Sequence, residues 1–432
     1  MILRLSDSLS RGLIVAAALC FGAALSYYSV RTARASWVAD NGTASGMVLA
    51  TRLEPSNPEY WYRLGHFEQF NLEQPDSGRA VQFLKTALAL DPRYTDAWLD
   101  LGTAYELDGR NVEARDAYLH AKQSYPASGE VSWRYGNFLL RQGDTQEAYP
   151  EFRRSLQTDP RRAASAFSRC FRANPNIDNI LDQVFPPIPS AYVDVIKETS
   201  DAKQLSLAQL VWRRLLTLHP RLKVQDFAPL VAGLLAEGEI TEARRVWGEG
   251  AQAMYLPSLL PLPGSVVWDP SFESGVNGGR FAWEFKIFTQ GVTTAYDATE
   301  KLSGNQSLRL TFDGKHNPEI DVACTLAIVS PNTNYHFSAW VKTANLASDR
   351  GIGFRIRSYT NLGEAPLVSS REIHGTNPWT FIEMPYSSER EVNRATICII
   401  RERDLDSDVR ISGTAWVDDV NLVPQSEEPK KK

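Results

Sequence analysis

The sequence is poor in the residues that reactive protein chemistry most often uses. Its 432 residues include four cysteines and six histidines, and the formal net charge is −5. Four cysteines are too few for a disulfide-dense scaffold. A mildly acidic chain also lacks the clustered positive surface that general nucleic-acid binding requires, so no nucleic-acid partner is expected. The length predicts two to four domains.

Motifs for catalysis are also missing. The sequence contains no Gly-x-Ser-x-Gly, no His-Glu-x-x-His and no phosphate-binding loop. A glycoside hydrolase would need two positioned carboxylates, and the adjacent pair Asp418-Asp419 is better explained as a landmark of a fold described below. We therefore expect no catalytic activity and no cofactor for chemistry.

Charge is absent from a stretch within the first 36 residues. Residues 12–28 are uncharged, and this 17-residue run reaches the lower limit for a membrane-spanning helix. A cleaved signal peptide is the alternative, because Ala33-Arg34-Ala35 has the small-residue spacing of a cleavage site. The run exceeds the usual apolar core of a signal peptide, which favours an uncleaved anchor. We expect a single-pass protein of the bacterial inner membrane with its bulk in the periplasm. Cleavage would instead give a secreted or periplasmic protein.

A period of 34 residues runs through the next part of the chain. It separates Gly102 from Gly136, Gly109 from Gly143, and each of the prolines 92, 126 and 160. The unit that includes Trp98, Leu101, Gly102, Tyr105, Ala114, Tyr118 and Pro126 resembles the tetratricopeptide repeat at nearly every signature position. That resemblance implies an α-solenoid, in which each helix pair buries its apolar face against its neighbours.

The predicted array covers residues 37–255. It is clearest over 58–160, where the first unit carries three extra residues in a turn near 72–78. Over 161–255 the pattern is divergent and indicates two or three further helical pairs, interrupted by the proline-rich residues 185–189. An unrelated helical spacer is the alternative for this part.

The first helices of the repeats are expected to line the concave face of the solenoid. They offer Tyr62, Arg63, His66, Asp100, Thr103, Glu106, Arg134, Asn137 and Arg141. The array implies a protein or peptide partner on this face. The alternative is a solvated helix face without a ligand.

The composition and the periodicity of the sequence change after residue 255. Residues 256–264 hold three prolines and a glycine, which predicts a semi-rigid linker. Beyond it, short runs with period two predict strands near 307–312, 335–341, 352–359, 380–384, 395–400 and 414–422. Such a series over 265–424 indicates a β-sandwich or jelly roll. The charged residues 425–432 are expected to form a disordered tail. The predicted fold class is thus multidomain, with helices first and strands second.

A succession of short motifs gives the β-region a more specific resemblance. Phe272-Glu273-Ser274-Gly275, Trp283, Ser303-Gly304, Trp340, Trp379 and Trp416-Val417-Asp418-Asp419 follow one another in this order. The order resembles carbohydrate-binding modules of families four and nine, which have a galactose-binding-like jelly roll. The opening residues 268–271 depart from the asparagine and glycines often found there.

That resemblance implies a polysaccharide ligand and a structural ion. The three landmark tryptophans 340, 379 and 416 match positions that serve the fold, so they are expected in the core. Many relatives hold a structural calcium ion where the ends of the domain meet. Glu273 and Asp418 occupy the matching regions and offer the oxygen ligands that calcium prefers.

Alternation along two strands predicts a different ligand surface. Arg355, Arg357 and Tyr359 share one face of their strand. Arg401 and Arg403 share a face of another. Adjacent strands would join these residues into a basic groove with an aromatic edge, which suits an acidic or hydroxyl-rich glycan. A solvated sheet face is the alternative.

The cysteines leave two possibilities open. Cys324 and Cys398 form either a disulfide or two buried thiols, because spacing alone does not establish the geometry. Cys20 would lie in the membrane and Cys170 would be unpaired. Together these features predict a non-catalytic, membrane-anchored envelope scaffold that recruits a protein and binds a polysaccharide, in a setting of exopolysaccharide assembly or export. The alternative is a purely protein–protein assembly factor.

Overall fold

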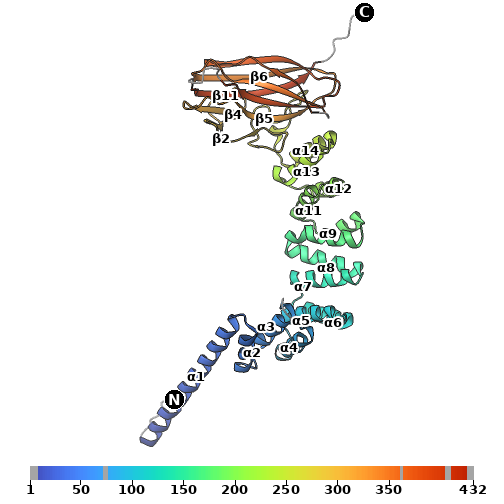
Figure 1. Cartoon of the computed structure of the whole chain (residues 1–432), viewed down its shortest axis with the longest axis vertical. Coiled ribbons are helices and arrows are strands. Elements are labelled where there is room, and N and C mark those ends of the chain that lie inside the picture. The colour runs from blue at the N-terminus through green and yellow to red at the C-terminus, as the bar shows by residue number, and fades with distance from the viewer. Residues whose placement is uncertain (1–7, 72–75, 361–362, 404–409, 426–432) are drawn as a thin grey trace, which may run out of the picture. The chain divides into compact units, whose positions relative to one another are not determined.

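The chain consists of helices followed by strands (Figure 1). The structure, a computed structural model, describes residues 8–71, 76–360, 363–403 and 410–425. They form two compact units, residues 1–191 and 192–432. The predicted class, α first and β second, is confirmed. Residues 426–432 of the predicted tail and residues 72–75 of the predicted turn lie outside the described residues.

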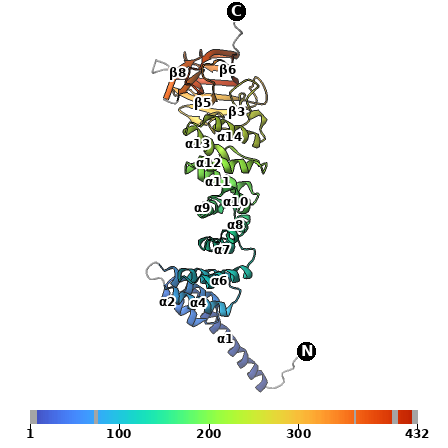
Figure 2. The same ribbon diagram turned by 90° about the vertical axis from the view of Figure 1, so that its right-hand side faces the viewer.

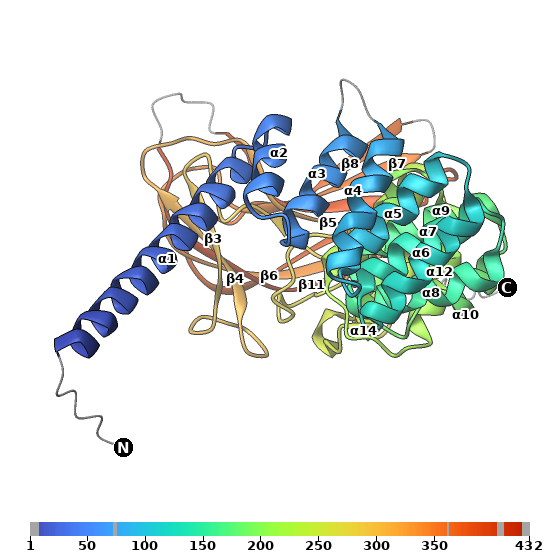
Figure 3. The same ribbon diagram turned by 90° about the horizontal axis from the view of Figure 1, so that it is seen from below.

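Helix α1 (Ser8–Asp40) is one uninterrupted helix (Figure 3). Within the described residues, its segment Arg11–Asp40 is long and apolar enough to cross a membrane. One face of the last turns of the same helix is buried, with Ala35, Val38 and Ala39 packed against Ala50 of the next helix. The predicted boundary after residue 36 therefore lies inside a helix, and no separate linker precedes the array.

Helices pack in successive pairs in the first compact unit, α1 with α2, α3 with α4, α5 with α6 and α7 with α8. The helices after α1 are α2 (Ala44–Leu53), α3 (Pro58–Phe70), α4 (Ser77–Leu90), α5 (Thr95–Leu107), α6 (Asn111–Ser124), α7 (Gly129–Arg141), α8 (Thr145–Thr158), α9 (Ala163–Ala173) and α10 (Ile177–Gln183). A Cβ on Gly102 would lie 3.0 Å from the ring of Tyr118, so glycine permits the close approach of α5 and α6. Gly109 and Gly143 have φ of 73° and 81° in the turns within their pairs.

The second unit begins within helix α11. Its helices are α11 (Pro189–Asp201), α12 (Leu205–Leu216), α13 (Val224–Ala236) and α14 (Ile240–Ala253). The expected break at residues 185–189 is present, because α10 ends at Gln183 and α11 begins at Pro189. The divergent region 161–255 thus contains three further pairs, at the upper end of the prediction.

The last helical pair packs against the strands (Figures 1 and 2). Trp247 of α14 is fully buried, and its ring lies 6.1 Å from the ring of Trp268 and 5.6 Å from that of Phe281. The predicted linker between them contains a short 3-10 turn, Pro257–Leu259. Leu259 is buried, and its carbonyl accepts the N–H of Asp269 at 3.0 Å. The proline-rich segment is therefore part of the packed second unit.

The strands form two antiparallel sheets. One sheet has the order β1 (Glu284–Phe285), β5 (Ile320–Ile328), β10 (Arg394–Arg401), β7 (Gly353–Thr360) and β8 (Gly363–Ser369). The other has the order β2 (Phe288–Thr289), β3 (Val292–Asp297), β4 (Ser307–Asp313), β11 (Ser412–Pro424), β6 (Asn334–Leu346) and β9 (Gly375–Ser387). All six predicted strands are present, and the apolar side chains of both sheets share one core.

Candidate functional site

The residues predicted for the concave face of the array lie on α3, α5 and α7, where three of them form a polar row. Asp100 and Arg134 occupy equivalent positions of successive repeats, 34 residues apart, and His66 lies in the repeat before them. Nδ1 of His66 lies 2.7 Å from Oδ2 of Asp100, and Nη2 of Arg134 donates to Oδ1 of Asp100 at 2.9 Å. Asp100 is 2% exposed. One buried carboxylate therefore links three successive repeats.

The neighbouring positions continue this polar row. Arg134 also donates to the hydroxyl of Thr103 at 2.7 Å. Arg141 donates to both carboxylate oxygens of Glu106, at 2.6 and 2.8 Å, which is the bidentate geometry of a strong charged pair. The amide of Asn137 donates to the carbonyl of Trp133 within its own helix. These predicted partner-binding residues thus form hydrogen bonds to a neighbouring repeat or within their own helix. The bonds between repeats fix the position of one repeat relative to the next.

A pocket beside helix α3 is lined by three of the predicted concave residues, Tyr62, Arg63 and His66. It has a volume of about 270 Å³, and its other lining residues are Ala39, Asp40, Met47 and Phe67. Arg63 and Asp40 form a salt bridge at 2.8 Å on its wall. Burial, followed by the charge of nearby Asp100, raises the pKa of Tyr62, so its phenol remains a neutral hydrogen-bond donor. Three of the predicted concave residues thus border a cavity; partner binding there remains a prediction.

The predicted glycan face lies on the five-stranded sheet. Strands β7 and β10 are adjacent, as the prediction required, with Arg355 opposite Cys398, Arg357 opposite Thr396 and Tyr359 opposite Arg394. Phe354 and Ile356 are fully buried on the other side. Arg355 pairs with Glu402 at 2.8 Å and with Asp321 at 3.4 Å. The charge of Arg355 is therefore largely neutralised within the domain.

Arg401 does not belong to this face. It is 1% exposed, and its guanidinium donates to the carbonyl of Pro318 at 2.7 Å and to the hydroxyl of Ser348 at 3.1 Å. It has the same parity along β10 as the core residue Ile399, which explains why its side chain turns inward. Arg403 is exposed and lies beyond the end of β10. The predicted groove thus loses Arg401 as a ligand-facing residue.

A pocket of about 320 Å³ lies on the outer side of the same sheet. Of the predicted glycan residues, Tyr359 lines it. The other lining residues come from α13 and from the strands and loop beside it: Ala232, Leu235, Ala236, Arg280, Glu284, Cys324, Thr325, Leu326, Arg394 and Thr396. Arg394 lies over the ring of Tyr359 at 6.0 Å and donates to the carbonyl of Leu235 at 3.3 Å. Sequence reasoning missed Arg280 and Arg394, because neither shares a sequence run with Tyr359.

The landmark tryptophans are not core residues, contrary to the prediction. Trp340, Trp379 and Trp416 are all half-buried on strands of the six-stranded sheet. The ring of Trp340 contacts Phe381 at 5.1 Å, and Nε1 of Trp416 donates to Asp297 at 2.9 Å. The flanking residues of Trp340 and Trp416 take the core side, so alternation turns both rings outward.

The two carboxylates predicted to hold calcium bind the same loop. Glu273 accepts the backbone N–H of Gln306 at 2.9 Å. Asp418 accepts those of Leu302 and Ser303 at 2.9 and 3.2 Å. Burial raises the pKa of Asp418 to about 6, although these N–H groups oppose the shift. The start and the end of the domain thus lie against the same loop, as predicted. Both carboxylates accept hydrogen bonds from backbone N–H groups of that loop. Calcium binding remains a prediction.

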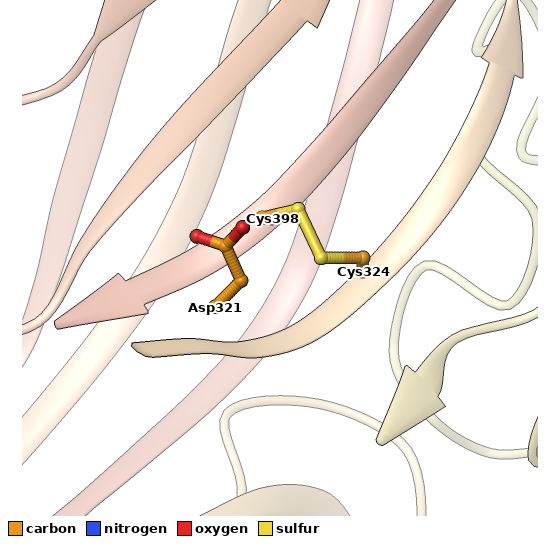
Figure 4. Close-up of side chains that lie close together, drawn as sticks. All are labelled: Asp321, Cys324 and Cys398. Atoms are coloured by element: carbon orange, nitrogen blue, oxygen red, sulfur yellow. A yellow bond between two sulfur atoms is a disulfide. The ribbon is translucent and has the colours of Figure 1, made fainter. Parts of the chain in front are cut away.

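Cys324 and Cys398 form a disulfide across β5 and β10 (Figure 4). They are directly opposite in the register, with a Cα–Cα distance of 4.1 Å. Asp321 lies beside them and could complete a group of three metal-ligand atoms. A metal would need the free thiolates, which the disulfide removes. Cys170 is buried and unbonded, and burial raises its pKa to about 12.

Different known proteins are similar to the helical part and to the β-part of the chain. Residues 72–132 match the family model described as tetratricopeptide repeat. No curated protein matches the sequence. Among solved structures, YrrB, described as a tetratricopeptide repeat protein with an unusual peptide-binding site, is 14% identical, with a TM-score of 0.25. The similarity covers 49% of this chain and 94% of that chain.

The β-region is similar to solved carbohydrate-binding modules. A xylan-binding family 22 module from Paenibacillus barcinonensis is 15% identical with a TM-score of 0.27, covering 37% of this chain and 93% of that chain. A family 16 carbohydrate-binding module is 14% identical with a TM-score of 0.26, covering 37% of this chain and 99% of that one. The tetratricopeptide repeat is matched over residues 72–132, and the β-sandwich is similar in fold to these carbohydrate-binding modules.

Proposed function

We propose that this protein is a non-catalytic, membrane-anchored scaffold of the bacterial envelope that recruits a protein through its repeats and binds a polysaccharide through its sandwich. Assembly or export of an exopolysaccharide would be its setting. The observation that carries the proposal is the joining of three elements in one chain: an apolar helix, a repeat array and a sandwich with a ligand-sized pocket around Tyr359.

The continuity of α1 supports an uncleaved anchor over a signal peptide. Cleavage after Ala35 would remove a side chain that is fully buried against the first repeat. It would also remove Arg31, whose Nε donates to the carbonyl of Leu53. The disulfide Cys324–Cys398 supports a location in an oxidising compartment, where such bonds persist.

Glycan binding by the full chain, purified in detergent, tests the central claim. We expect binding to at least one acidic or hydroxyl-rich polysaccharide on an array, and Tyr359→Ala should weaken it at least about tenfold, or 1.4 kcal/mol. Trp340→Ala is the matched control, because it removes an aromatic ring from the other sheet. Absence of binding to every glycan by the folded chain contradicts the proposal.

A protein-only assembly factor is the second candidate. It is favoured by the internal pairing of Arg355 with Glu402 and Asp321, which makes the predicted groove less basic. In that case the triple substitution of Arg355, Arg357 and Tyr359 by alanine would release a co-purifying protein. Under the first proposal the same triple variant loses glycan binding and retains the protein partner.

A further inference from the structure

The pocket around Tyr359 is built from two parts of the second unit. The sheet supplies its floor through Thr396, Leu326 and the disulfide residue Cys324. Helix α13 supplies a wall through Ala232, Leu235 and Ala236. Helix α13 thus borders one side of the sheet face, and the site is a recess between helix and sheet that is open to solvent.

Positive charge exceeds negative charge among the lining residues. The guanidinium of Arg280 has no partner among the residues that the structure describes, and Arg280 is exposed. Arg394 gives one hydrogen bond to the carbonyl of Leu235, whereas a guanidinium has five N–H donors. Glu284 is the one carboxylate among the described lining residues, and it accepts the backbone N–H of Arg280 at 2.9 Å. The pocket therefore offers unused cationic donors.

Neutral hydrogen-bonding groups and an aromatic ring lie beside these cations. No hydrogen-bond partner for the hydroxyls of Tyr359 and Thr396 occurs in the described part of the chain. Leu326 and the three residues of α13 add apolar surface. A ligand that matches this lining has an anionic group, several hydroxyls and an apolar ring face.

We propose that this pocket binds a single acidic sugar residue of the uronic-acid type, at an end or branch of a polysaccharide. The inference rests on the proposed glycan-binding function and deepens it. A carboxylate accepts paired N–H donors from guanidinium groups. The volume of about 320 Å³ is at the lower end for ligand pockets, which suits one ring better than an extended chain segment.

Titration calorimetry on the full chain in detergent tests this inference. The probes are short glucuronic-acid oligomers and glucose oligomers of equal length. We expect the acidic oligomer to bind at least about tenfold more tightly than the neutral one. Arg280→Gln and Arg394→Gln should each weaken acidic binding by a similar factor and leave neutral binding nearly unchanged. Arg309→Gln is the matched control, because Arg309 lies on β4 of the other sheet, pairs with Asp297 and does not line the pocket.

A second variant keeps the test decisive if the arginine substitutions disturb the fold. Ala236 is exposed at the end of α13, so Ala236→Trp should fill the pocket without changing its charge or the core. It is expected to abolish acidic binding at an unchanged melting temperature. Equal binding of both oligomers, insensitive to Arg280, Arg394 and Ala236, overturns the acidic pocket while leaving glycan binding intact. Binding of no oligomer and of no glycan on the array overturns the proposed function itself. Binding of a peptide carboxylate in place of both oligomers also overturns the inference.

Discussion

Trp247 joins the last helical pair to the sandwich, and its removal should destabilise both. The side chain is fully buried and contacts Phe227 at 5.5 Å within the helices, and Trp268 and Phe281 on the other side. The indole N–H has no hydrogen-bond partner among the described residues, so its contribution is packing alone. Replacing a buried tryptophan by alanine costs about 3–5 kcal/mol, which is a large part of the 5–15 kcal/mol of a typical domain.

Hydrogen exchange measured by mass spectrometry on the full chain separates the two sides of this contact. Trp247→Ala should raise exchange in α14 and also in β5 and its neighbour β10, because Trp247 packs on Phe281, whose carbonyl accepts the hydroxyl of Thr325 in β5. Trp212→Ala is the matched control: Trp212 is equally buried, and its ring contacts Phe227 among the helices. The control should raise exchange mainly in the helices. If Trp247→Ala leaves exchange in the strands at the wild-type level, the helices and the sandwich unfold independently and the reasoning is refuted.

A corollary concerns where the sandwich can be cut from the chain. A fragment that starts at residue 265 would expose the rings of Trp268 and Phe281, whereas a fragment of residues 192–432 keeps them covered. We expect the shorter fragment to aggregate or melt at a lower temperature than the longer one. Equal melting temperatures of the sandwich in both fragments would contradict this expectation.

Three further predictions concern titration and the disulfide. Burial raises the pKa of Asp418 to about 6, so the native state favours the protonated carboxyl. The free energy of unfolding, measured with urea, should therefore fall by about 3 kcal/mol as pH rises from about 4 to 6. In Asp418→Asn the free energy of unfolding should fall by about 3 kcal/mol less over the same pH range. The hydrogen bond to Asp100 raises the pKa of His66, so its NMR titration should lie above 6.5 and move down in Asp100→Asn; an unchanged midpoint would exclude the contact. The disulfide closes 74 residues, so reduction, or the double substitution of Cys324 and Cys398 by serine, should cost roughly 4 kcal/mol in denaturant unfolding.

The repeat array could be predicted from the sequence because its physics is local. A fixed period records the same close contacts in every unit, such as the one between Gly102 and the ring of Tyr118. The attachment of the last pair to the sandwich could not be predicted in this way. The prolines of 256–264 are typical of a linker, and the burial of Leu259 depends on a partner surface more distant in the chain.

The candidate sites show the same division between local and non-local information. Alternation correctly placed Arg355, Arg357 and Tyr359 on one face, because a strand with one buried side repeats every two residues. Alternation along β10 puts Arg401 on the side of the core residue Ile399, but the prediction took charge to mean exposure. Acceptors from distant loops make the burial of Arg401 tolerable. Strand β5 was not predicted, since outer-face residues such as Leu326 are also apolar and obscure the alternation.

The uninterrupted α1 has a mechanical consequence for any partner of the repeats. A flexible tether would let the array explore a wide cone of directions above a bilayer, and every binding event would have to overcome that orientational freedom. If α1 is the membrane anchor that we propose, a helix that leaves the bilayer and packs on α2 would transmit its tilt to Ala35, Val38 and the helices packed on them. A partner in the same membrane would then meet the pocket lined by Tyr62, Arg63 and His66 at a fixed distance from the bilayer and in a fixed orientation. The two proteins would find each other by diffusion in two dimensions.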